Sequence, residues 1–118
     1  MFSKERLHNE LIQSTNMSAV ELPSWLRTDI APITVANYKD APSLDQSNKL
    51  LTILMKNTEE LTRTDCFFIQ SILQRIKYLK NNRSKEGYAR LDWENSLRSL
   101  GYDIKKQLKP AKKSKAYH

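Results

Sequence analysis

The stretch TDCFFIQSILQRIKYLKN, residues 64–81, carries two different faces at helical spacing. At about 100° per residue, one broad face is apolar and gathers Phe68, Ile69, Ile72, Leu73, Ile76 and Leu79. A second, narrower face is aromatic and polar and consists of Phe67, Ser71, Gln74 and Tyr78. A helix with this pattern either lies between neighbouring elements or presents its second face to a partner. The stretch therefore predicts a long central helix around which the rest of the chain is organised.

The composition indicates one soluble helical domain. A chain of 118 residues suffices for a single hydrophobic core but hardly for two, and only two glycines argue against a turn-rich β fold. No apolar run approaches the ~20 residues of a membrane span, and the N-terminus carries charges where a signal peptide needs an apolar core. We therefore expect an intracellular protein, either cytoplasmic or associated with the nucleoid or nucleus, that does not enter a membrane.

Charge is divided unevenly between the two halves of the chain. Residues 1–60 hold six Lys/Arg and eight Asp/Glu, whereas residues 61–118 hold fourteen and five. The second half thus accounts for the whole formal charge of +7. Such an asymmetry predicts a polyanionic partner, most often nucleic acid.

Capping residues mark where the helices begin. The candidates are Ser3, Ser43 with Gln46, Thr62 or Thr64, and Asp103. Together with apolar spacing they predict helices over residues 4–15, 44–61, 65–81, 88–100 and 104–109, with Gly101 as a left-handed C-cap after the fourth. Because only two or three residues separate the second helix from the third, these two are expected to pack as an antiparallel hairpin.

Residues 17–42 form a proline-rich segment that should not hold a long helix. Pro23, Pro32 and Pro42 remove backbone donors and favour extended geometry in the residues before them. We expect an arm that wraps the domain, extended over residues 33–35 and buried at Trp25, Leu26 and Ile30. A docking peptide that inserts Trp25 into a partner is the alternative.

These elements define an all-α fold of the helical-bundle kind. Three main helices, an N-terminal helix and the proline-rich arm make up one domain over residues 1–109, and residues 110–118 are a basic tail expected to be disordered.

Residues that carry catalysis or bind metals are scarce. The chain has no Ser/His/acid set, no phosphate-binding glycine loop, and one cysteine with two histidines, too few for a zinc site. His8 is interpreted as an exposed helical residue and Cys66 as a buried structural thiol. We therefore expect that the protein is not an enzyme and that it uses no cofactor, metal or small-molecule substrate.

Basic residues cluster around the end of the central helix and at the end of the chain. The predicted nucleic-acid contacts are Arg75, Lys77, Lys80, Arg83, Lys85, Arg90, Lys105, Lys106, Lys109, Lys112 and Lys113. If the central and last helices lie on the same side, these residues form one surface that follows a phosphate backbone. Tyr78, Tyr88 and Tyr102 lie among them and could stack on unpaired bases. Residues 96–109 faintly resemble a helix-turn-helix, but Pro110 ends the second helix after about two turns.

Two functions remain open at this point. The preferred prediction is a small non-enzymatic nucleic-acid-associated regulator or accessory subunit that binds mainly through phosphates. The alternative is a protein-binding adaptor or inhibitor, which would insert either the second face of the central helix (Phe67, Gln74, Tyr78) or the Trp25 arm into a protein partner.

Overall fold

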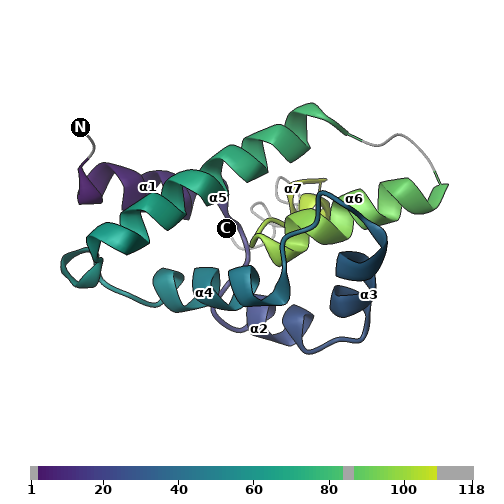
Figure 1. The fold of residues 1–118 in the computed structure, drawn as a ribbon, viewed down its shortest axis with the longest axis horizontal. Coiled ribbons are helices and arrows are strands. Elements are labelled where there is room, and N and C mark those ends of the chain that lie inside the picture. Colours follow the sequence, from purple (N-terminus) through teal and green to yellow (C-terminus); the bar gives the residue numbers. More distant parts are fainter. Residues whose placement is uncertain (1–2, 84–86, 109–118) are drawn as a thin grey trace, which may run out of the picture.

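The computed structural model describes residues 3–83 and 87–108, and within them it contains helices and no strand. The elements are α1 (Lys4–Ser14), α2 (Glu21–Leu26), α3 (Ile30–Asn37), α4 (Leu44–Leu54), the 3₁₀ turn η1 (Thr58–Glu60), α5 (Arg63–Asn81), α6 (Gly87–Ser99) and α7 (Ile104–Leu108). Figure 1 shows α5 crossing the molecule as its longest helix, with α6 returning from its far end. The all-α prediction is confirmed. None of these described helices is both long and apolar enough to cross a membrane.

The main core forms on the predicted apolar face of α5. Cys66, Ile69, Ile72, Ile76 and Leu79 are buried there against side chains from α1, α4 and α6, among them Leu7, Leu11, Leu50, Ile53, Trp93 and Leu97. A smaller cluster of Leu22, Trp25 and Ala31 fills the space under α2 and α3. The helix periodicity therefore identified the buried face of α5 correctly.

Capping contacts explain where the first helices begin. The Ser3 hydroxyl accepts a hydrogen bond from the Arg6 backbone N–H, and reciprocal capping boxes join Ser43 to Gln46 and Thr62 to Asp65. Each cap satisfies backbone donors that the helix itself cannot bond. These predicted starts are confirmed.

The helix expected over residues 44–61 is shorter than predicted. It ends at Leu54, because Asn57 and Glu60 form a further capping box around η1 and start a separate turn. The expected hairpin is also wrong: α5 packs chiefly along α1 and touches α4 only slightly. Lys4 of α1 donates to the Leu61 carbonyl oxygen just before α5, and Ser14 at the end of α1 lines the same groove as Asn81 at the end of α5, so α1 and α5 run in the same direction.

The proline-rich segment folds into two short helices. The prediction that residues 33–35 are extended is wrong, since they lie in the middle of α3. Pro32 is tolerated because it sits in the first turn, where a backbone N–H has no partner inside the helix. Trp25 is buried as expected, Leu26 is partly buried, and Ile30 is half-exposed rather than buried.

Gly101 ends α6 in the predicted left-handed conformation. Its φ is 83°, the Tyr102 N–H donates to the Leu97 carbonyl oxygen, and the Gly101 N–H donates to that of Arg98, both at 2.9 Å. This pair of bonds is a Schellman motif. The Asp103 carboxylate then accepts from the Lys105 N–H at 3.0 Å and caps α7.

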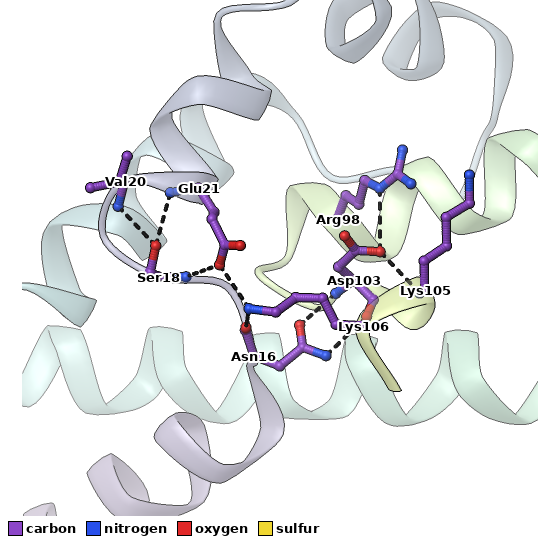
Figure 2. A network of polar contacts seen from close by, with 8 residues as sticks. All are labelled: Asn16, Ser18, Val20, Glu21, Arg98, Asp103, Lys105 and Lys106. Carbon is purple, nitrogen blue, oxygen red and sulfur yellow. Dashed lines mark hydrogen bonds and ion pairs between the residues drawn. The ribbon is translucent and has the colours of Figure 1, made fainter. Parts of the chain in front are cut away.

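Polar contacts join the corner between α6 and α7 to the segment that follows α1 (Figure 2). The Lys106 ammonium donates to the backbone oxygen of Asn16 and, at 2.8 Å, to the Glu21 carboxylate. Glu21 in turn accepts from the Ser18 N–H at 2.8 Å. The pKa of Glu21 is lowered, chiefly by the hydrogen bond from Lys106 and then by the one from Ser18. The last helix is thereby fixed to the start of α2.

Candidate functional site

The second face of α5 is turned to solvent. Ser71 and Gln74 are exposed, and the side chains of Phe67 and Tyr78 keep 53% and 49% of their surface. The guanidinium of Arg63 lies over the Phe67 ring, 5.9 Å from its centre. We call this face the α5 ridge; one hollow of the surface lies along its α1 side, and a second hollow includes Ser71, Gln74 and Tyr78 of the ridge itself.

A groove lies between α1 and α5 on one side of the ridge. Its volume is about 760 Å³, and α5 supplies Gln70, Leu73, Gln74, Ile76, Lys77, Lys80 and Asn81 to its wall. From α1 come Ser3, Arg6, Leu7, Glu10 and Ser14, with Arg6 and Glu10 paired at 3.6 Å. Leu7 and Ile76 are buried, so the groove has an apolar floor between polar and basic sides.

A smaller hollow lies between α5 and residues 39–40, and three residues of the ridge line it. Its volume is about 450 Å³, and it is lined by Lys39, Asp40, Ser71, Gln74, Arg75 and Tyr78. The Arg75 guanidinium donates to the Asp40 backbone oxygen at 3.3 Å and so holds the loop against the helix. Gln74 lines both the groove and the hollow.

Three of the predicted basic residues lie three positions apart at the C-terminal end of α5. Lys77 is exposed, the Lys80 ammonium lies 4.0 Å from the centre of the Tyr102 ring, and the Arg83 guanidinium lies 5.3 Å from that of Trp93. No carboxylate among the described residues pairs with these three cations. Aromatic contact orients Lys80 and Arg83 without neutralising them.

The remaining predicted basic residues are not all gathered with these three. Arg75 faces the opposite hollow, Arg90 is half-buried on α6, Lys105 is exposed on α7, and Lys106 is committed to Asn16 and Glu21. Lys85, Lys109, Lys112 and Lys113 fall outside the described residues, as does the tail predicted over 110–118. Over the described residues the chain carries fifteen Lys/Arg and twelve Asp/Glu. The excess of positive charge over the described residues is therefore small, and the candidate site is defined by where the cations at the end of α5 lie rather than by the net charge.

Two aromatic residues predicted to contact partners lie inside the protein. Tyr102 is 8% exposed under Lys80, burial raises the pKa of its phenol, and it cannot stack on a base. The Trp25 ring is buried, its indole N–H donates to the Ser99 hydroxyl at 2.9 Å, and Arg98 lies over its face at 5.2 Å. Trp25 is thus a core residue and not a presented docking side chain. The side chain of Tyr88 is outside the described part.

His8 is buried, which corrects the prediction of an exposed residue. Its Nδ1 lies 2.7 Å from the Thr58 hydroxyl, and its Nε2 has no hydrogen-bond partner among the residues that the structure describes. The burial arises because η1 covers this side of α1, a contact between residues 50 positions apart that α1 alone does not reveal. Cys66 is buried, as predicted. In the described ranges no group of three His, Cys, Asp or Glu residues could hold a metal ion.

Residues 10–98 match the family model DUF3140, described as a protein of unknown function. The chain belongs to the DUF3140 family. No curated protein and no solved structure matches it. The DUF3140 match runs from α1 to the last turn of α6 and contains the whole of α5, whereas α7 and the basic C-terminus lie beyond it.

Sequence reasoning missed the groove of this DUF3140 protein. The α5 residues Gln70 and Asn81 adjoin the predicted second face and could have been included from helix geometry alone. Arg6 and Glu10 could not, because nothing in the sequence indicates that α1 rather than α4 lies along α5.

Proposed function

We propose that this protein is a small non-enzymatic nucleic-acid-binding regulator or accessory subunit that works inside the cell. The observation that supports this most directly is the set of three cations at the end of α5, Lys77, Lys80 and Arg83, which meet no described carboxylate. Cations that are not neutralised by a protein partner are available to phosphates.

The spacing of these residues suits a phosphate backbone. Side chains three positions apart on a helix stand about 5–6 Å from one another, so Lys77 and Lys80 present a short row of charge along the groove. The basic residues of the segment 109–118 would add to the same electrostatic attraction. Binding of this kind releases counterions and is therefore strongly salt-dependent.

The test compares variants that differ in where two positive charges are removed. Fluorescence anisotropy with a labelled oligonucleotide, repeated at several salt concentrations, gives the slope of log affinity against log salt. K77Q/K80Q should reduce the magnitude of that slope by about 1.4 for a single strand or about 1.8 for a duplex, at 0.7 and 0.9 per phosphate. The control R27Q/K49Q removes two exposed charges from α4 and the end of α2 and should leave the slope nearly unchanged.

The absence of measurable binding to either a single strand or a duplex at low salt would end this proposal. An equal effect of the two double variants would also count against it, because it would mean that only the net charge matters.

A protein-binding adaptor is the second candidate, and the exposed ridge of α5 favours it. Phe67 and Tyr78 both present about half of their surface on this ridge, and Gln74 of the same ridge lines the groove with the apolar floor. Exposed aromatic side chains are frequent anchors in protein interfaces. In this case F67A/Y78A would abolish partner capture from nuclease-treated extract, whereas K77Q/K80Q would retain it.

A further inference from the structure

We infer that the nucleic acid is single-stranded and that Tyr78 stacks on one of its bases in the hollow between α5 and residues 39–40; this inference rests on the proposed function. The hollow is lined by an exposed aromatic ring and polar side chains, and it shares Gln74 with the basic groove. The two features belong to one continuous surface.

Tyr78 offers the kind of surface that an unpaired base occupies. The residue keeps 49% of its surface exposed and forms part of the wall of the hollow. Ser71 and Gln74 lie on the same face of α5, two turns and one turn before it, and Asp40 comes from the facing loop. Hydroxyl, carboxamide and carboxylate groups supply both donors and acceptors to the edge of a stacked base.

The arrangement of the hollow is held in place by the protein itself. Arg75 bonds the Asp40 backbone oxygen, so the loop that forms one wall is fixed to α5 before any ligand arrives. Asn82 donates from its carboxamide to the Tyr78 backbone oxygen at 2.8 Å and reinforces the last turn of the helix. A site that is already formed loses little entropy when a base enters it.

Gln74 connects the two halves of the surface. It lines the groove that holds Lys77 and Lys80 as well as the hollow that holds Tyr78. A strand that crosses the ridge at Gln74 can therefore place phosphates beside the lysines and a base on the tyrosine. Combined backbone attraction and base stacking is the usual way in which proteins bind single strands without reading their sequence.

A duplex cannot use the hollow in the same way. Its bases are paired and stacked within the helix, and turning one out costs a few kcal/mol. Duplex binding would then depend on the cations alone. The structure thus assigns a preference for unpaired strands to one side chain, Tyr78, rather than to the charge.

The test measures the affinity of the full chain for a pyrimidine 15-mer and for the same sequence as a duplex, at one low salt concentration. Because stacking on an aromatic side chain is worth 1–3 kcal/mol per base, Y78A should weaken single-strand binding by about 5- to 150-fold and leave duplex binding nearly unchanged. Y78F should bind like the wild type. F67A serves as the matched control. It removes the other exposed ring of α5, and Phe67 lines neither the groove nor the hollow.

A fluorescent variant gives a second, independent readout. In Y78W the new indole is exposed while Trp25 and Trp93 stay buried, so quenching by an added single strand reports stacking at position 78. Quenching by the single strand but not by the duplex is the expected result.

The outcomes separate the two proposals. If K77Q/K80Q weakens binding but Y78A behaves like F67A and Y78W is not quenched, the stacking site is wrong and the phosphate-binding function stands. If the wild type binds neither oligonucleotide, both are overturned.

Discussion

The carboxamide of Asn16 bonds both backbone groups of Asp103. Its Nδ2 donates to the Asp103 carbonyl oxygen at 2.9 Å, and its Oδ1 accepts from the Asp103 N–H at 2.7 Å. One side chain therefore fixes the start of α7 to the segment after α1 (Figure 2). We predict that N16A lowers the free energy of unfolding by about 2 kcal/mol, since it leaves two partly buried groups without partners at about 1 kcal/mol each.

Urea unfolding measures this difference. The control N9A, at an exposed position of α1, should change the stability by less than about 0.5 kcal/mol. Equal losses in N16A and N9A would show that the contact with Asp103 contributes nothing.

The two glycines should respond differently to replacement by alanine. Both have positive φ, 68° at Gly87 and 83° at Gly101, which costs an alanine roughly 1–2 kcal/mol. At Gly87 an added Cβ would meet no atom of the described residues within 4 Å, whereas at Gly101 it would lie 3.0 Å from Cγ2 of Thr15. We predict from thermal unfolding that G101A is clearly less stable than G87A. Similar melting temperatures would contradict the steric contribution of Thr15.

The starts of α1, α4 and α5 and the end of α6 were predictable because their signals are local. A cap such as Ser3 or Thr62 bonds a backbone group three residues away, and Gly101 ends a helix through its own φ. The exposed ridge of α5 was predictable for the same reason, since helix periodicity alone places Phe67 and Tyr78 on one face.

Neither the packing of one helix against another nor the burial and pairing of individual side chains was predictable, because both depend on contacts between distant parts of the chain. Lys106 resembled the other lysines until it was found beside Glu21, 85 residues away. Tyr102 is covered by Lys80, and His8 by η1. The groove likewise depends on α1 lying along α5, which no short-range pattern specifies.

Asp65 should make the stability of the protein depend on acid pH. Burial by itself raises the pKa of this carboxyl group, but hydrogen bonds from the Lys56 ammonium at 2.7 Å and the Thr62 N–H at 3.0 Å bring it below its ordinary value. A lowered folded-state pKa means that the stabilisation is present above the unfolded pKa of about 4 and is lost as the pH falls through the folded value.

We therefore predict that D65N is about 1–2 kcal/mol less stable than the wild type at pH 7, as for the loss of a charged hydrogen bond, and that the difference shrinks below about pH 4. Urea unfolding at pH 7, 5 and 3 measures it. The exposed Glu59 provides the control, because E59Q should change the stability little at any of these pH values. A D65N difference that stays constant down to pH 3 would show that the carboxylate charge is not what stabilises this corner.

The thiol of Cys66 should react only when the protein opens. It is buried in the main core, at 1% exposure, between α5 and its neighbours. We predict that Ellman's reagent modifies the native protein at least about a hundredfold more slowly than the urea-unfolded chain, because core residues become accessible only through openings that cost several kcal/mol. Immediate reaction of the folded protein would contradict the burial of this residue.

Trp25 should matter for stability and not for binding. Its indole N–H donates to the Ser99 hydroxyl, and the Ser99 carbonyl oxygen accepts from Ser47, so the ring is part of a buried polar contact between α2, α4 and α6. We predict that W25F costs about 1–3 kcal/mol of unfolding free energy, since it leaves the Ser99 hydroxyl without its donor, while the affinity for a single strand is unchanged. S99A should cost a similar amount, and W25F/S99A less than the two losses together, because the same bond is removed only once. A folded W25F protein that no longer bound its partner would place Trp25 at the interface and would favour the alternative in which residues 17–42 are a docking peptide.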